Sequence, residues 1–338
     1  METLTIEGIA KLAGVSQATV SRVINNSDLV SETTRIKVEQ IIKQNNFKPK
    51  NAARALANQD MVKTIAVLVS EINNEYFGKL LLGIGEVADE LGLQVMIYNT
   101  NNSYTKEKAI LDGLRANFIH GIIYTPSIYY KSEAEEREIL ECIKVLKVPV
   151  VLVDRTFQSG NFDGVFFDDG KAMYEATQYF IKQGHKNIGI ISGDFNGYLI
   201  SIRDQGVQKA LDEAGLEIPE ENWLRCDYTV DSTCELTLAR FSKPNPPTAF
   251  LLGNNQIALG FLKAINQLNL KLNKDVFCIG IDQILTLDYI DYGYSYIERN
   301  SEIMGMEAAR LLFEKMDKPN EKNASVYIPA PVILKDGY

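Results

Sequence analysis

Hydrophobic and polar residues follow two different rhythms along the chain, and the change between them falls near residue 63. Before that point, apolar residues recur every three or four positions, as on one face of a helix, for example at Ile6, Ile9, Ala10 and Ala13. After it, short β-branched runs alternate with longer amphipathic stretches. The pattern predicts a small helical segment in front of a larger α/β body.

The first fifty residues are predicted to form three short helices around a shared apolar seam. Gly14 interrupts the first helix, Ser16 can cap the second, and Ser31 can cap a third that ends before Pro49. On the second helix, Val20 is predicted to face inward, and small polar residues and an arginine are predicted to face outward. Proteins that place a helix in the major groove of DNA use this arrangement: two short helices joined by a tight turn, with polar side chains on the outer face of the second helix.

The body is predicted to contain repeated strand–helix units. Strands are expected at 65–70, 94–99, 121–125, 149–154, 188–192, 249–253 and 277–282. Helices are expected at 76–91, 105–116, 133–146, 170–183, 202–214, 232–241, 255–268 and 302–316. This many units fits two doubly wound parallel sheets, each covered on both faces, better than one. We expect an N-lobe of about 64–158 plus 294–317, and a C-lobe of about 162–290 plus 320–338.

Composition and cysteine usage restrict the class of protein. At 338 residues and 46% hydrophobic, the chain is long enough for two or three domains with large cores. Its four cysteines are scattered without a CxxC pair, which indicates reduced thiols. Its apolar runs are shorter than the roughly 18 residues that a membrane span needs, and its N-terminus does not read as a signal peptide. We therefore expect a cytoplasmic protein with no membrane partner.

The charge is divided unevenly along the chain. Residues 1–60 carry eight basic and six acidic residues, a net charge of +2, which leaves −11 on residues 61–338 out of the total of −9. Phosphates attract a basic surface and repel an acidic one. Any contact with DNA is therefore expected at the front of the chain.

The outer face of the second helix carries side chains that can read base edges. Arg22 can bond both acceptors of guanine, Gln17 suits adenine, and the small Ala18 admits a thymine methyl group. Thr19 and Ser21 can bond phosphates, which position a protein on DNA without specifying sequence. The same pattern also fits an ordinary helical hairpin with a polar face.

The amino-acid sequence itself favours a DNA-contacting helix over an ordinary helical hairpin. The run AKLAGVSQATVSRVINN, at residues 10–26, closely resembles the helix-turn-helix of the lactose/galactose repressor (LacI/GalR) family of bacterial transcription regulators. The resemblance continues through VSETTRIKV and PKNAARALA. It implies a helix-turn-helix domain at 1–49, a hinge at 50–63, and an effector-binding and dimerisation core at 64–338 with the fold of the periplasmic sugar-binding proteins.

The resemblance also assigns a role to the hinge. In the family this segment is a helix that folds on DNA and inserts a leucine into the minor groove, and Leu56 matches that position; such a wedge unstacks a base step and bends the duplex. The alternative is a flexible linker whose leucine is incidental. The residues expected at the DNA are Thr5, Ser16, Gln17, Ala18, Thr19, Ser21, Arg22, Asn25, Arg54 and Leu56.

The core is expected to bind an effector between its lobes. Ligands of open parallel sheets bind outside the carboxyl ends of the strands, and the resemblance matches several residues there to the pocket of the family. Those residues are Tyr76, Phe77, Asp154, Arg203, Tyr228, Asn254 and Asp282. Carboxylate and amide groups bond hydroxyls, an arginine provides a planar fork, and aromatic rings cover the apolar face of a sugar ring.

Each of these residues also has a structural alternative, because a strand-end Asp or Asn often caps the next helix and Tyr228 can simply pack. The chain departs from the family at Asn255, where an Asp is usual, and the position after Asp282, where an acid or amide is frequent, holds Gln283. The family's usual C-terminal Arg-x-Ser-Thr is also replaced, by LKDGY. These departures leave open which ligand binds, and do not affect the predicted fold.

Other motifs are assigned to structure. The GxGxxA match at 83–88 lies within a predicted helix, where it indicates close helix packing instead of a dinucleotide site. His120 and His185 lack partners for catalysis, and no motif for a nucleophile, a phosphate loop or a metal is found. We expect no enzyme activity and no cofactor, which disfavours a Rossmann-type enzyme.

The sequence thus predicts a homodimeric transcription regulator, most simply a repressor, that binds double-stranded operator DNA. Its effector is expected to be a sugar, a sugar phosphate or a sugar acid. The alternative is a solute-binding protein without a DNA role, which would need a signal peptide and no head domain.

Overall fold

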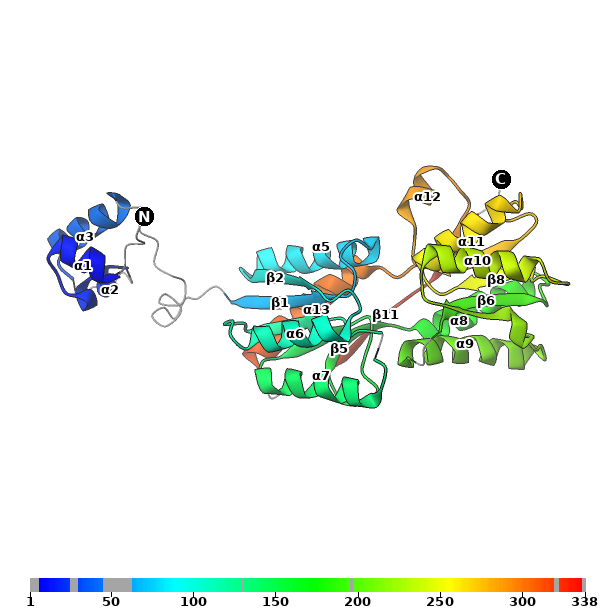
Figure 1. The fold of residues 1–338 in the computed structure, drawn as a ribbon, viewed down its shortest axis with the longest axis horizontal. Helices are drawn as coiled ribbons and strands as arrows, with labels where there is room; N and C mark the ends of the chain where they lie inside the picture. The colour runs from blue at the N-terminus through cyan, green and yellow to red at the C-terminus, as the bar shows by residue number, and fades with distance from the viewer. Residues whose placement is uncertain are drawn as a thin grey trace. The chain divides into compact units, whose positions relative to one another are not determined.

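The computed structural model describes residues 6–24, 30–44, 63–128, 130–194, 197–318 and 322–335. The chain divides into two compact units, residues 1–62, called the head, and residues 63–338, called the core (Figure 1). Each unit is described separately. Residues 50–62 of the predicted hinge lie outside the described ranges.

The head contains the three predicted helices, α1 (Ile6–Ala13), α2 (Gln17–Ile24) and α3 (Glu32–Gln44). Its core is formed by small and β-branched side chains from all three: Ile9, Ala10, Ala13, Val20, Val23 and Val38. Gly14 has a φ of +63°, and the amide of Val15 donates to the carbonyl of Ala10 over 3.0 Å, which ends α1. The turn between α1 and α2 therefore needs the glycine that the sequence provides.

The first lobe of the core, the N-lobe, is built on a parallel sheet with strand order β11-β5-β4-β3-β1-β2. Its strands are β1 (Thr64–Val69), β2 (Gln94–Asn99), β3 (Gly121–Tyr124), β4 (Val150–Val153), β5 (Asp163–Phe167) and β11 (Ser325–Ile328). The pair α5 (Glu75–Glu90) and α13 (Ser301–Asp317) covers one face, and the pair α6 (Tyr104–Leu114) and α7 (Glu133–Leu146) covers the other. The central strands are buried on both sides, which explains their unbroken apolar runs.

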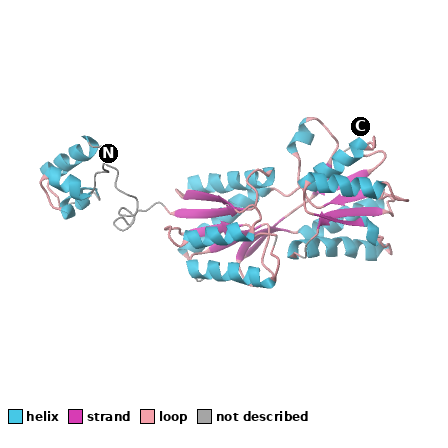
Figure 2. Cartoon of the chain, in the orientation of Figure 1, coloured by secondary structure: helices cyan, strands magenta, loops and turns pink. Residues whose placement is uncertain are grey.

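The second lobe, the C-lobe, has strand order β12-β10-β9-β8-β6-β7, with only β12 antiparallel to its neighbour. Its strands are β6 (Ile188–Gly193), β7 (Trp223–Cys226), β8 (Ala249–Leu252), β9 (Phe277–Ile281), β10 (Ser295–Ile297) and β12 (Val332–Ile333). Its helices are α8 (Asp169–Lys182), α9 (Tyr198–Ala214), α10 (Val230–Phe241), α11 (Asn255–Gln267) and the short α12 (Leu285–Tyr289). Figure 2 shows each sheet between layers of helices.

The structure corrects the predicted lobe boundaries. β5 was expected in the C-lobe, within 162–290, but it pairs with β4 in the N-lobe sheet. β10 was expected in the N-lobe, within 294–317, but it pairs with β9 in the C-lobe sheet. β11, expected in the C-lobe with 320–338, pairs with β5 in the N-lobe. The chain therefore crosses between the lobes three times, and an apolar strand looks the same in sequence whichever sheet it joins.

The elements predicted from the sequence agree closely with the structure, while β5, β7, β10, β11, β12 and α12 were not predicted. The seven predicted strands are confirmed to within two residues at each end, and α9 begins at Tyr198, four residues before the predicted start. The glycine motif is confirmed as a packing feature, because a Cβ on Gly83 would lie 2.0 Å from the carbonyl oxygen of Glu302 on α13. Gly305 of α13 is equally close to the backbone of α5. Among the described residues, no helix is long and apolar enough to cross a membrane.

Candidate effector cleft and DNA-contacting helix

All seven predicted effector residues line one cleft between the two lobes, with a volume of about 150 Å³. Tyr76 and Phe77 lie in the first turn of α5, Asp154 follows β4, and Arg203 lies on α9. Tyr228, Asn254 and Asp282 follow β7, β8 and β9. The arrangement follows from the two sheets, whose strands end on either side of the same cleft.

Three of these residues have an unusual backbone conformation. Asp154, Tyr228 and Asp282 have φ angles of 66°, 62° and 74°, in the left-handed region that non-glycine residues rarely adopt. Such conformations cost about 1–3 kcal/mol each and persist where the surrounding structure holds them, often at binding sites. Each of the three turns the chain sharply at the end of a strand. All three line the cleft, although other residues with a positive φ, such as Lys147 and Asn273, lie elsewhere.

Asp154 is the buried acid on the N-lobe side. Its Oδ1 accepts hydrogen bonds from the Tyr76 hydroxyl at 2.9 Å and from Nη1 of Arg299 at 2.8 Å, and Nε of Arg155 lies 3.1 Å from its Oδ2. Burial alone would raise the pKa of Asp154, but Arg299, Arg155 and Arg203 outweigh it and lower the pKa. Asp154 is therefore an ionised acceptor. Burial and the Asp154 charge raise the pKa of Tyr76 well above its usual value, so its hydroxyl remains a donor.

Arg299 joins the two lobes at the base of the cleft. Its Nε and Nη2 each donate to one oxygen of Asp282 over 2.8 Å, while Nη1 binds Asp154. The guanidinium also lies over the Tyr76 ring at 4.7 Å, and its side chain is only 6% exposed. Burial would lower the pKa of Arg299, but Asp282, Tyr76 and Asp154 raise it well above the usual value. Sequence reasoning missed Arg299, although a charged residue two positions after a buried strand was a usable signal.

Arg203 is the buried cation on the C-lobe side. Its Nε and Nη2 donate to Oδ1 of Asp169 at 2.8 and 2.6 Å, and its Nη1 donates to the carbonyl of Gly253 at 3.1 Å. These bonds use three of the five N–H groups of the guanidinium. They hold the side chain at the cleft with donor capacity left over. Asp169, in the run FFDDG directly after β5, was also missed from the sequence.

The amides of the cleft have mixed roles. The Asn254 side chain accepts from the amide of Ile257 at 2.8 Å, so it caps α11, the structural alternative noted above, while it also lines the cleft. Its neighbour Asn255 exchanges amide hydrogen bonds of 2.9 and 3.4 Å with Asn74 of the N-lobe. The residue that departs from the family thus bridges the lobes.

A wider pocket of about 310 Å³ adjoins the cleft, and we call it the mouth pocket. The two share Ile128, Arg155, Leu199 and Tyr228. Within the described parts of the chain, no group of three or more His, Cys, Asp and Glu side chains is placed to hold a metal ion.

The head presents α2 as predicted. Gln17, Ala18 and Arg22 are exposed, and Thr19 and Ser21 are partly exposed. Val20 and Val23 on the opposite side are buried. Ser16 caps α2, since its Oγ accepts from the amide of Thr19 at 3.1 Å. The other residues expected at the DNA lie outside the described ranges: Thr5, Asn25, Arg54 and Leu56.

Comparison with known proteins places both units. A family model described as bacterial regulatory proteins, lacI family, matches residues 5–50, and one described as periplasmic binding proteins and sugar binding domain of LacI family matches residues 62–336. Catabolite control protein A of Priestia megaterium is 28% identical over 327 residues, 96% of each chain. The HTH-type transcriptional repressor PurR of Vibrio campbellii is 30% identical over 335 residues, 97% of each chain.

Solved structures share the fold. The lac repressor dimer bound to operator and the anti-inducer ONPF superimposes with a TM-score of 0.79 at 23% identity, over 99% of each chain. The complex of the transcriptional regulator CelR with cellobiose gives a TM-score of 0.72 at 24% identity, also over 99% of each chain. The head match argues against a solute-binding protein without a DNA role. The chain belongs to the LacI family of DNA-binding transcriptional regulators.

Proposed function

We propose that this chain is a transcriptional repressor that contacts operator DNA through α2 and whose DNA affinity is set by a small neutral sugar between the lobes. The observation that carries the proposal is the convergence of the seven predicted effector residues, from separate parts of the chain, on one cleft of about 150 Å³. In this proposal the protein is a binding protein instead of an enzyme, and it acts in the cytoplasm.

The charges of the cleft favour a neutral ligand. Three arginines line the cleft, and each pairs with a buried aspartate: Arg155 with Asp154, Arg203 with Asp169, and Arg299 with Asp154 and Asp282. Glu71 and Asp227 also line the cleft, so its cations are not in excess. A neutral sugar can bond the remaining N–H groups and lone pairs without disturbing this balance. A phosphate or carboxylate would add a buried charge without a free partner in this group, which is costly. A sugar is therefore favoured over a sugar phosphate or a sugar acid.

The DNA contacts follow from the exposed face of α2. Arg22 and Gln17 can bond guanine and adenine edges, and Thr19 and Ser21 can bond phosphates. The lac repressor in the solved complex is a dimer bound to operator, and a two-fold dimer would place two heads on the half-sites of a pseudo-palindromic operator.

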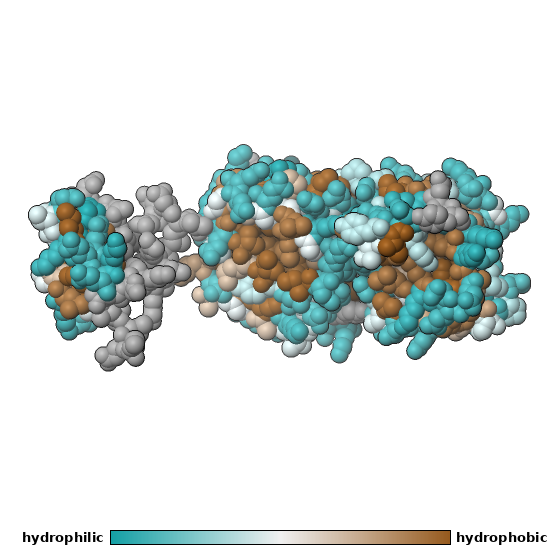
Figure 3. Space-filling view, turned by 90° about the horizontal axis from the view of Figure 1, so that it is seen from above, coloured by the Kyte–Doolittle hydropathy of each residue, from teal (hydrophilic) through white to brown (hydrophobic). Residues whose placement is uncertain are grey.

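A homodimer is further supported by the surface of the core. Large apolar side chains are exposed on α5, β2 and α13 and after α12, and Figure 3 shows apolar areas over both lobes on one face. These residues include Leu82, Ile97, Ile303 and Ile290. Apolar surface of this kind is typical of protein interfaces.

Regulation follows from the position of the cleft. A ligand that contacts Asp154 on the N-lobe and Arg203 or Asp282 on the C-lobe binds more tightly to one closure state of the lobes than to another. It therefore shifts the population of the protein toward the closure state that it binds more tightly. Because β1 directly follows the predicted hinge in the chain, a change in closure can reach the DNA-contacting segments. By reciprocity, DNA changes the affinity for the sugar by the same factor.

Gel-shift assays with the DNA upstream of the protein's own gene test the proposal. Binding should weaken with salt, and Arg22→Ala should reduce it at least about tenfold, whereas Lys43→Ala, which removes the same charge from α3, should have a small effect. Sequence-specific binding that is unchanged in Arg22→Ala would contradict the assignment of α2.

The cleft is tested in the same assay with an effector panel. Glucose, galactose, ribose and cellobiose represent neutral sugars, and glucose 6-phosphate and gluconate represent the charged classes. A neutral sugar should change the DNA affinity, and Arg203→Ala should abolish that response, with circular dichroism confirming the fold. A response to the phosphate or the acid alone would refute the neutral assignment, and a normal response of Arg203→Ala would refute the cleft.

A further inference from the structure

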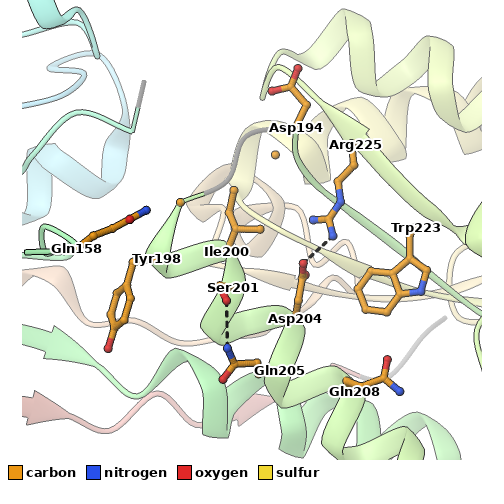
Figure 4. Close-up of a pocket in the computed structure, with 12 residues that line it drawn as sticks. Gln158, Asp194, Tyr198, Ile200, Ser201, Asp204, Gln205, Gln208, Trp223 and Arg225 are labelled. Carbon is orange, nitrogen blue, oxygen red and sulfur yellow. Dashed lines mark hydrogen bonds and ion pairs between the residues drawn. The ribbon is translucent and has the colours of Figure 1, made fainter. Parts of the chain in front are cut away.

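A second hollow lies along α9 on the C-lobe (Figure 4), and we call it the α9 groove. Its volume is about 940 Å³, several times that of the cleft. None of the predicted effector residues lines it. The side chains that define its chemistry are Tyr198, Asp204, Gln205, Gln208, Trp223 and Arg225.

The walls of the α9 groove combine aromatic and planar polar groups. Trp223 is the single tryptophan of the chain and is partly buried at the start of β7, with the Arg225 guanidinium 5.6 Å from its ring centre. Arg225 in turn donates to Asp204 at 2.6 Å, which fixes its position (Figure 4). Gln205 and Gln208 are exposed one turn apart on α9. Amides and carboxylates bond hydroxyls, and an indole ring covers the apolar face of a sugar ring.

The α9 groove adjoins the mouth pocket, which in turn adjoins the effector cleft. It shares Gln158, Gly197, Tyr198 and Ile200 with the mouth pocket, and the mouth pocket in turn shares Tyr228 and three other residues with the cleft. From Tyr198 to Gln208 the wall of α9 extends about 15 Å, at about 1.5 Å per residue. An elongated ligand can therefore lie with one end in the cleft and the rest along α9.

We propose that the α9 groove binds the outer sugar units of a neutral oligosaccharide whose terminal unit occupies the cleft. The inference rests on the proposed function of the cleft and adds a length preference to it. Arg225 in the groove is paired with Asp204, and Asp194 adds a second acid. The groove thus offers no unpaired cation among its lining side chains for a phosphate or an acidic sugar.

The single tryptophan makes the groove directly observable. The full-length protein is titrated with the malto-, cello- and xylo-oligosaccharide series, from the monosaccharide to the tetrasaccharide, by calorimetry and tryptophan emission. In the series that binds, the tetrasaccharide should bind about tenfold more tightly than the disaccharide, as expected for one or two added hydrogen bonds. Its binding should also change the Trp223 emission more than the disaccharide does.

Variants on the exposed face of α9 separate the two sites. The double variant Gln205→Ala, Gln208→Ala should lose the length preference while its affinity for the disaccharide stays unchanged. Gln183→Ala, an exposed glutamine at the end of α8, is the matched control and should retain the length preference. Equal affinity for all lengths, with no length-dependent emission change, would overturn the groove and leave the cleft intact. Binding by no member of any series, together with no response to any neutral sugar of the effector panel, would overturn the carbohydrate assignment of both.

Discussion

Replacing Arg299 by glutamine tests whether the ion-pair network at the base of the cleft holds the two lobes together. Arg299 donates three hydrogen bonds of 2.8 Å, one to Asp154 of the N-lobe and two to Asp282 of the C-lobe. Glutamine fits the available space but cannot reach both carboxylates and carries no charge. The variant therefore leaves two buried acids that face each other across the cleft.

The expected magnitude follows from the burial of the three side chains. They are 6%, 4% and 9% exposed, so water cannot replace the lost partner. Removing one partner from a buried ion pair costs about 3–5 kcal/mol. For a unit of this size each kcal/mol shifts the melting temperature by about 2–4 °C, so the variant should melt about 10 °C lower.

Thermal unfolding of the full-length protein, followed by circular dichroism, measures the shift. Arg310→Gln is the matched control, because Arg310 pairs with Glu307 on the surface of α13, where the two side chains are 47% and 39% exposed. Exposed pairs contribute about 0–1 kcal/mol, so the control should melt within about 3 °C of the native protein. Equal melting temperatures for the two variants would refute the role assigned to Arg299.

The same experiment has a pH dependence of defined sign. In the native protein the pKa of Asp154 is lowered, so its contribution to stability is present at neutral pH and is lost as the pH falls below about 4. In Arg299→Gln, only Arg155 and Arg203 still offset the effect of burial, so the pKa of Asp154 should rise and acid should relieve part of the buried charge. The gap between the two melting temperatures should narrow from pH 7 to about pH 4.5. A constant gap would mean that the loss is not electrostatic.

Three further outcomes are expected. Gly83→Ala should destabilise the core by about 2–3 kcal/mol or more in denaturant titrations, because the added Cβ would meet the α13 backbone. Gly85→Ala is the control and should stabilise the core slightly, because Gly85 has open space around it. Similar effects of the two substitutions would contradict the packing of α5 on α13. Ser16→Ala removes the cap of α2 and should cost about 1 kcal/mol, seen as faster hydrogen exchange of the α2 amides, and unchanged exchange would argue against the cap. In the native protein a thiol reagent should modify the half-buried Cys142 alone, and the three buried cysteines should react only after unfolding. The reaction of Cys142 should be faster at high pH, because burial and Asp112 raise the pKa of its thiol.

The seven predicted strands and the long helices could be found from the sequence because each repeats one of two periodicities, whereas five strands of two to five residues could not. β5 and β10 show where this information ends. Both are short apolar runs, and the sheet that each one joins is decided by the packing of the crossovers between the lobes, which leaves no local pattern. The predicted boundary, between residues 158 and 162, precedes β5, whereas the chain crosses to the C-lobe after β5.

The candidate site could be predicted only in part. Residues such as Asp154 and Asp282 were found because carboxyl ends of parallel strands converge, so a polar residue directly after a strand is informative. Arg299 and Asp169 were missed because their importance lies in the partners they bind, which come from the opposite lobe or from a distant helix. The sequence also could not show that Asp282 is already bound on both oxygens by Arg299.

The three crossovers also govern how this protein must be made. β11, at the edge of the N-lobe sheet, and β12, at the edge of the C-lobe sheet, follow every other described element in the chain. Neither sheet can therefore be completed during translation until residues 325–333 have emerged from the ribosome. Until then the edges of both β5 and β10 remain unpaired and open to wrong partners. A premature stop before residue 325 would damage both lobes at once, and a single proteolytic cut at one crossover would release neither.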